Sequence, residues 1–218
     1  TVKILAIGDL THDVKTFTVE KPEGYTYKPG QATDVAINKD GWQEEKRPFT
    51  FTGLNEDPQL EFTIKRYPEH EGVTDQLHQL QPGDELIIDD PWGAITYDGP
   101  GYFIAAGAGL TPFIAIFRQL KQDNNLPDNS VIYTNKTSND IILKEDLEVW
   151  FACNCHFTVT REDSVIFDTN HIDEDYLKER VTDFSKKFYI CGPDGFVADV
   201  KKHLANLGVE SEALVFEE

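Results

Sequence analysis

The chain has 218 residues, 39% of them hydrophobic and 27% charged, a globular composition that can bury the core of one large domain or two small ones. An excess of 39 acidic over 20 basic residues gives a net charge of −19, which argues firmly against a nucleic-acid ligand because its phosphates would be repelled. No apolar run is long enough to span a membrane, and the N-terminus lacks the pattern of a signal peptide.

Residues 1–98 are expected to form an all-β domain. Short segments rich in β-branched or aromatic residues alternate with turns containing Pro, Gly, Asn or Asp, a spacing that suggests a small antiparallel barrel. One short helix interrupts them, with Thr74 as its N-cap and residues 75–80 as its body. The predicted strands are Val2–Ile7, Val14–Val19, Thr33–Ile37, Phe49–Leu54, Leu60–Lys65 and Glu85–Asp89.

Two stretches of this first half are candidate ligand-binding segments. In the sequence RPFT at 47–50, Arg47 and Phe49 share one face of a regular strand and Thr50 lies on the other. Taken alone, Phe49 is better explained as a core residue and Arg47 as a surface charge. The sequence GVT at 72–74 offers free backbone N–H groups to an anion at a helix start, or simply caps that helix.

Residues 99–218 are expected to form an α/β domain. From Gly101 onward strands and helices alternate, which is typical of a doubly wound parallel sheet that binds ligands at the carboxyl ends of its strands. The predicted strands are Tyr102–Ala106, Val131–Thr134, His156–Thr160, Phe188–Cys191 and Ala213–Phe216, and the predicted helices are Pro112–Gln122, Leu143–Val149, Glu174–Val181 and Pro193–Leu207.

The turn after the first of these strands is a candidate phosphate site. Gly107 and Gly109 lack Cβ atoms and let the backbone approach a bulky ligand. Thr111 is expected to cap the following helix, and Pro112 suits its first turn. Strand, turn and helix N-terminus together can bind a phosphate group, although the same residues also suit a plain strand-to-helix connection.

A second turn at the carboxyl end of a strand places the Cys191 thiol near a helix N-terminus, which would favour the thiolate. From its position alone, a small buried structural cysteine is the favoured interpretation. Cys153 and Cys155 lack the spacing of a redox, zinc or iron–sulfur motif, so no metal site is predicted. Three cysteines in all favour a reduced, cytoplasmic setting.

Five stretches, in the correct order, resemble the ferredoxin–NADP reductase superfamily and specifically its compact flavodoxin-reductase-like oxidoreductases. They are RPFT at 47–50, IKRYPEHEGVTDQL at 64–77, DPWG at 90–93, GAGLTP at 107–112 and YICGPDGF at 189–196. The resemblance implies an FAD-binding Greek-key barrel at 1–98 followed by an NAD(P)-binding α/β domain at 99–218.

The resemblance also implies an enzyme that passes hydride from NAD(P)H to N5 of FAD. Electrons would then leave to a protein such as flavodoxin or ferredoxin, or to a small acceptor. Two alternatives stay open: a flavin-binding electron-transfer subunit of a larger complex, and a ferric or quinone reductase.

Each motif residue receives an expected role from the resemblance. Thr50 would hydrogen-bond near the flavin N5, Cys191 would lie beside the nicotinamide, and Glu217 falls where the family often has a carboxylate, so these three are the predicted catalytic residues. The predicted FAD-binding residues are Arg47, Pro48, Phe49, Thr50, Ile64, Lys65, Gly72, Val73 and Thr74, and the predicted NAD(P)-binding residues are Gly107, Gly109, Thr111, Pro112, Lys136, Arg161, Cys191, Gly192 and Pro193.

The ends of two strands bear on the choice between NADPH and NADH. NAD-selective folds usually place an acid at the end of the second strand, where this chain has Thr134-Asn135-Lys136. The third strand ends in Thr160-Arg161, where some NADPH-using relatives have a hydroxyl–arginine pair. Both features favour NADPH, unless Lys136 and Arg161 are only solvated loop charges.

Overall fold

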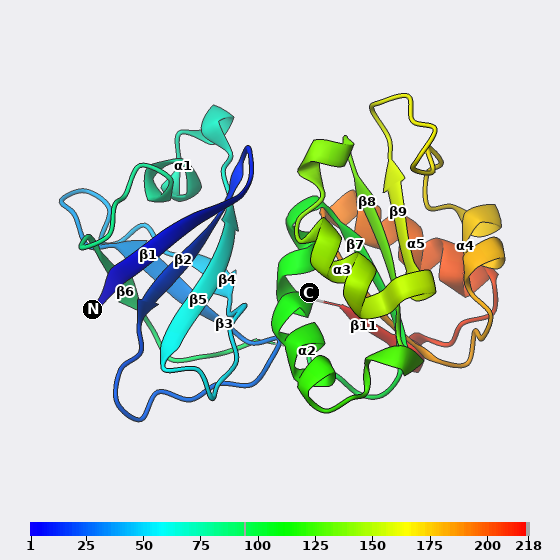
Figure 1. Cartoon of the computed structure of the whole chain (residues 1–218), viewed down its shortest axis with the longest axis horizontal. Helices are drawn as coiled ribbons and strands as arrows, with labels where there is room; N and C mark the ends of the chain where they lie inside the picture. The colour runs from blue at the N-terminus through cyan, green and yellow to red at the C-terminus, as the bar shows by residue number, and fades with distance from the viewer. Residues whose placement is uncertain (94, 217–218) are drawn as a thin grey trace. The chain divides into compact units, whose positions relative to one another are not determined.

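The computed structural model describes residues 1–93 and 95–216 (Figure 1). The chain forms two compact units: unit 1 comprises Thr1–Thr96 and Thr111–Gln119, and unit 2 comprises Tyr97–Leu110 and Leu120–Glu218. Within the described residues, no helix combines the length and the apolar character that crossing a membrane requires.

Unit 1 is built on a six-stranded antiparallel sheet in the order β4-β3-β6-β1-β2-β5 (Figure 1). The sheet closes on itself where Phe51, directly after β4, pairs with Phe62 of β5. This barrel-like sheet confirms the predicted all-β fold of the first half. Its strands are β1 (Val2–Thr11), β2 (Val14–Glu20), β3 (Ala32–Ile37), β4 (Arg47–Thr50), β5 (Gln59–Lys65) and β6 (Glu85–Ile88).

The core of the barrel follows from strand alternation. In β5, Leu60, Phe62 and Ile64 are buried at every second position, and Phe17 of β2 packs in the same cluster. Each such side chain stabilises the fold by about 1.5–3 kcal/mol through the apolar surface that it removes from water. The aromatic ring of Tyr27 stacks on Phe51 with the ring centroids 4.1 Å apart.

Two local predictions for this unit were wrong. Helix α1 (Val73–Leu77) has Gly72, not Thr74, as its N-cap, because the extended backbone ends at Gly72 and Val73 already turns helical to enter the core. The fourth strand begins two residues earlier than expected and ends four residues earlier, at Thr50, after which Phe51 forms a single bridge to Phe62.

Unit 2 holds a five-stranded parallel sheet in the order β11-β10-β7-β8-β9. The chain moves outward from β7 through β8 and β9 and then returns to the other side, so the topological switch lies between β7 and β10. This order confirms the predicted doubly wound fold. The strands are β7 (Gly101–Ala106), β8 (Ser130–Asn135), β9 (Cys155–Val159), β10 (Lys187–Cys191) and β11 (Leu214–Phe216).

The helices that connect these strands are α2 (Thr111–Gln122), α3 (Lys144–Phe151), α4 (Glu174–Arg180) and α5 (Asp194–Asn206). The central strand β7 is buried from Tyr102 to Ala105, as expected for a parallel sheet with both faces covered. Helix α5 turns Val200 and Leu204 inward and ends just before Gly208, whose φ of 86° belongs to the left-handed region that favours glycine.

Candidate functional site

The glycine turn at the carboxyl end of β7 is tightly packed against the end of β10. A 3-10 turn (η2, Gly107–Leu110) links β7 to α2. A Cβ atom on Gly109 would lie 2.3 Å from the carbonyl oxygen of Cys191, so only glycine fits this approach. The expected capping role of Thr111 was wrong, because η2 runs directly into α2 and Thr111 is the first residue of that helix.

The carboxyl end of β10 borders a pocket of about 380 Å³. Cys191 ends the strand, and Pro193 is the N-cap of α5 rather than a residue of its first turn. The Lys201 ammonium lies 3.4 Å from the centroid of the Phe216 ring, a cation–π contact. The pocket is lined by Ile190, Cys191, Gly192, Asp194, Val197, Ala198, Lys201 and Phe216.

Sequence reasoning missed Lys201 and Phe216 as pocket residues. A signal for Lys201 exists, because Asp194, Val197, Ala198 and Lys201 recur at the spacing of one face of a helix. Phe216 comes from β11 and joins them only through the parallel pairing of β11 with β10, which no local pattern shows.

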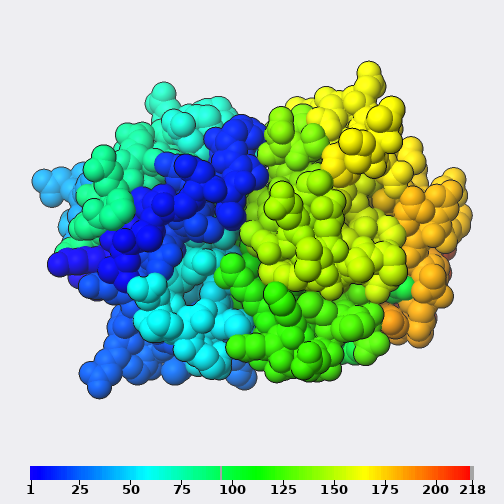
Figure 2. Space-filling view, in the orientation of Figure 1, coloured from blue at the N-terminus to red at the C-terminus, as the bar shows by residue number. Residues whose placement is uncertain are grey.

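The backbones of two basic residues, Lys136 and Arg161, meet where β8 and β9 end. The backbone N–H of Arg161 donates to the carbonyl oxygen of Lys136 at 2.8 Å. Both side chains are exposed, and neither forms an ion pair within the part of the chain that the structure describes. The loop that begins at Arg161, yellow in Figure 2, lies at the surface of unit 2. This edge of the sheet therefore presents two exposed basic side chains without ion pairs among the described residues, while the carboxylate of the neighbouring Glu162 accepts a hydrogen bond from the Ser138 hydroxyl at 3.3 Å.

In unit 1, β4 carries the RPFT residues along the edge of the β3–β4 pair. Phe49 lies opposite Thr33, and Thr50 lies opposite Ala32. The guanidinium of Arg47 is half exposed, and among the described residues its polar partners are a carboxylate oxygen of Glu45 at 3.7 Å and the Lys46 carbonyl at 2.6 Å. Phe49 is half-buried against the barrel core. The side chain of Thr50 is 8% exposed, and its hydroxyl has no partner among the described residues.

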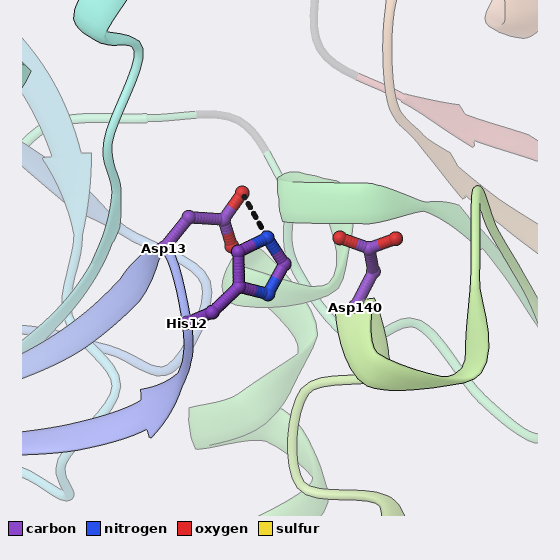
Figure 3. Close-up of side chains that lie close together, drawn as sticks. All are labelled: His12, Asp13 and Asp140. Atoms are coloured by element: carbon purple, nitrogen blue, oxygen red, sulfur yellow. Dashed lines mark ion pairs between the residues drawn. The ribbon is translucent and has the colours of Figure 1, made fainter.

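The predicted flavin residue Lys65 has a partner of its own. Its ammonium lies 2.5 Å from a carboxylate oxygen of Asp13, in the β1–β2 hairpin. Burial alone would raise the pKa of Asp13, but the hydrogen bond and charge of Lys65 lower that pKa below its usual range. Asp13 also pairs with His12 at 3.7 Å, as the dashed line in Figure 3 shows.

Asp140, drawn in the same figure, belongs to unit 2 and accepts hydrogen bonds from the Thr137 backbone and hydroxyl.

The segment that follows β5 leads into α1. The carbonyl of Ile64 accepts a hydrogen bond from Nε2 of His78 at 2.9 Å, and burial lowers the pKa of that imidazole. Arg66 pairs with the buried Asp75 of α1 at 2.7 Å, which ties the end of β5 to the first turn of the helix. These contacts hold the GVT segment in place. The predicted catalytic residue Glu217 lies outside the described residues.

Two family models match the chain in succession. The model described as an oxidoreductase FAD-binding domain matches residues 1–97, and the model described as an oxidoreductase NAD-binding domain matches residues 103–202. The chain belongs to the ferredoxin–NADP reductase superfamily. FAD and a nicotinamide dinucleotide are therefore its cofactors.

Solved members of this superfamily share the fold along nearly the whole chain. The FAD/NAD-binding domain of nitric oxide dioxygenase from Vibrio cholerae superposes with a TM-score of 0.89 at 22% identity, covering 99% of this chain and 96% of that one. A ferredoxin NADP+ reductase from Neisseria gonorrhoeae with bound FAD and NADP gives a TM-score of 0.81 at 21% identity, with the same coverage of both chains.

Curated relatives of this superfamily member are longer proteins. NADH-cytochrome b5 reductase 2 of Mycosarcoma maydis is 26% identical over 94% of this chain. The glycine betaine monooxygenase reductase subunit of Chromohalobacter salexigens is 26% identical over 96% of it. This chain spans 69% of the length of the first relative and 61% of the length of the second.

Proposed function

We propose that this chain is a flavin-dependent reductase that takes electrons from NADPH and delivers them to a separate redox protein. The observation that carries the proposal is the succession of an FAD-binding and an NAD-binding oxidoreductase domain in one chain. FAD, when bound, supplies the chemistry of accepting a hydride equivalent from the nicotinamide and releasing electrons to an acceptor. The residues of the chain bind and orient the two cofactors and set the polarity around them.

The side chains of β4 suit a flavin dinucleotide. The guanidinium of Arg47 is exposed and only loosely paired, so it is available to a pyrophosphate, which it can bind through two parallel N–H groups. Phe49 offers a half-buried ring for stacking, and the Thr50 hydroxyl is available as a donor to a ring nitrogen. Lys65 fits a flavin phosphate less well than expected, because Asp13 already holds its ammonium.

The carboxyl edge of the unit 2 sheet suits a dinucleotide. The turn is open at Gly107, where an added Cβ atom would meet nothing within 4 Å, so a pyrophosphate can approach its backbone there, while Gly109 is buried against the end of β10. The pocket beside Cys191 and Gly192 has the size and the mixed lining that a nicotinamide ring requires. Cys191 is placed there by the end of β10.

Two basic residues of this chain, Lys136 and Arg161, favour NADPH over NADH. The Mycosarcoma relative is named for NADH, whereas the Neisseria structure contains NADP. In this chain the backbones of Lys136 and Arg161 meet, and both side chains are exposed and form no ion pair among the described residues. A 2′-phosphate would give these two cations the anion that they lack, whereas a 2′-hydroxyl would not.

The acceptor is proposed to be another redox protein. The Chromohalobacter relative is named as the reductase subunit of a monooxygenase, and the Mycosarcoma relative is named for cytochrome b5. Flavodoxin and ferredoxin belong to the same class of acceptor. With a net charge of −19, this chain would repel an acidic acceptor except at a local basic surface, so a less acidic partner is favoured.

The nucleotide preference is tested by the double variant Lys136→Ala/Arg161→Ala. We expect its rate of flavin reduction at low NADPH to fall about tenfold or more, with the rate at low NADH unchanged, because two charged hydrogen bonds to the 2′-phosphate are lost. The measurement is stopped-flow absorbance under anaerobic conditions with each nucleotide.

The matched control is Lys178→Ala, which removes an exposed lysine of α4 that pairs with Asp175. The ratio of the NADPH rate to the NADH rate should stay at the unaltered value in this control. An equal loss with NADPH and NADH in the double variant would contradict a role for Lys136 and Arg161 in selecting the nucleotide.

A further inference from the structure

Strand β8 has a buried asparagine at each end, and the two differ in their hydrogen bonds. Asn129, just before the amino end, is fully buried and accepts from the Gly101 N–H at 3.0 Å while donating to the Asn125 carbonyl at 2.9 Å. Asn135, at the carboxyl end, is 5% exposed, yet neither its Nδ2 nor its Oδ1 has a partner among the described residues. The carboxamide of Asn129 therefore has a structural role, whereas the carboxamide of Asn135 forms no hydrogen bond among the described residues.

Asn135 stands out among the buried polar groups of unit 2. Arg180 and His203 each leave one ring or guanidinium nitrogen without a hydrogen bond, but both side chains have acidic partners, Asp168 and Glu174. In Asn135 the whole carboxamide is unsatisfied. Burying a donor and an acceptor without partners destabilises a fold, so such a group points to a ligand that completes it.

The position of Asn135 places it beside the glycine turn. Ala106, the last residue of β7, pairs with Thr134, so Asn135 extends one residue beyond β7 and pairs only with Val159 of β9. Side chains two apart share a strand face, and on that face the hydroxyl of Tyr133 donates to the Gly107 carbonyl at 2.8 Å. Asn135 therefore lies two residues beyond Tyr133 on the same face of β8, nearer to the carboxyl edge of the sheet.

The residues on either side of this position belong to the proposed nucleotide site. The glycine turn is open at Gly107, where an added Cβ atom would meet nothing within 4 Å. Lys136 directly follows Asn135 and contacts Arg161 through the backbone. Along the sheet edge, Asn135 thus lies between the proposed pyrophosphate turn and the proposed 2′-phosphate pair, which is the span that the adenosine half of a dinucleotide would follow.

We infer that Asn135 is a binding residue for the adenosine half of the nicotinamide dinucleotide. Its Nδ2 donates and its Oδ1 accepts, which matches a ribose, whose hydroxyl groups both accept and donate hydrogen bonds. The inference rests on the proposed function and assigns one of its nucleotide-binding residues, beyond those that the sequence motifs indicated.

The test compares Asn135→Leu with Asn129→Leu in the full-length, FAD-loaded protein. Leucine has a similar size and no polar atoms, so Asn135→Leu removes an unsatisfied group, whereas Asn129→Leu breaks the hydrogen bonds to Gly101, Asn125 and the Tyr97 hydroxyl. Isothermal titration calorimetry measures the Kd for NADP+ and for adenosine 2′,5′-bisphosphate, and thermal unfolding measures Tm without nucleotide. Asn135→Ala is measured in parallel, in case leucine does not fit.

For Asn135→Leu we expect the Kd of both ligands to rise about tenfold, as for the loss of one or two hydrogen bonds, with Tm unchanged or higher. For Asn129→Leu we expect a lower Tm with both Kd values unchanged. A lower Tm with unchanged Kd values in both Asn135 variants would overturn the inference and make Asn135 structural. If the unaltered protein binds neither ligand, the proposed function itself is overturned, and this inference falls with it.

Discussion

Thr50 is the residue whose position bears most directly on the proposed chemistry. It ends β4 opposite Ala32, is 8% exposed, and has a hydroxyl without a partner among the described residues. A hydroxyl held in this way has lost part of its hydration and gains from a ligand acceptor or donor. This is the property expected of a group that hydrogen-bonds to the reactive edge of a flavin.

We predict that Thr50→Val slows flavin reduction by NADPH about fivefold to tenfold while FAD stays bound, because one hydrogen bond near the reacting atoms is lost and the side-chain shape is kept. Stopped-flow absorbance measures the rate, and the flavin-to-protein absorbance ratio measures occupancy. Thr18→Val, a half-buried threonine of β2 outside the RPFT stretch, is the control. An unchanged reduction rate in Thr50→Val would remove Thr50 from the proposed site.

For single residues, the sequence indicated which side chains belong to the candidate site better than it indicated which residues they contact. Arg47 and Thr50 lie on opposite faces of β4, as the strand period requires, but burial in this strand does not alternate, since the exposed Pro48 shares the face of the buried Thr50. The pair of Lys65 with Asp13 joins positions far apart in the chain, and no local pattern shows it. Both capping predictions failed, since a cap depends on the backbone conformation of the preceding turn, which varies by one or two residues. The roles proposed for the individual site residues stay predictions.

At the scale of elements, the glycine turn after β7 packs against the end of β10, at the carboxyl edge of the unit 2 sheet where we propose that the dinucleotide binds. Gly109 allows this contact because its Cα can lie against the Cys191 carbonyl. The sequence indicated a strand-to-helix turn after each of these two strands, but it gave no sign that the two turns contact each other. The central position of β7 and the order of its neighbours bring them together.

We predict that Gly109→Ala lowers the free energy of unfolding by about 1–3 kcal/mol, because the added Cβ would overlap the Cys191 carbonyl and force the end of β10 to shift. NADP+ binding should weaken in the same variant. Gly195→Ala in α5 is the control, since a Cβ there meets nothing within 4 Å and alanine favours a helix. Thermal unfolding and calorimetric titration measure both effects. Equal stability of the two variants would refute the tight approach at Gly109.

The predicted helices and strands of unit 2 agree with the structure to within one or two residues, because each contains a buried apolar run or stripe, which is a local pattern. In unit 1, β4 and α1 were shifted. Both are short, so a single tertiary contact, the Phe51–Phe62 bridge or the burial of Val73, decides where they begin or end. Short elements depend on packing more than on pattern.

At the scale of the whole molecule, the change of pattern near residue 99 predicted a barrel followed by a parallel α/β sheet, and both fold classes are confirmed. The boundary between residues 98 and 99 remains a proposal. The excess of acidic residues gives no information about the fold, but it bears on the acceptor, because a charge of −19 favours encounter with a partner that is not itself strongly acidic.

The most direct test is the visible absorption spectrum of the purified protein, recorded before and after anaerobic addition of NADPH to one sample and of NADH to a second sample. The account predicts flavin absorption bands that bleach rapidly with NADPH and more slowly with NADH. Flavin bands that stay oxidised with both nucleotides, or a colourless protein that takes up no added FAD, would contradict it.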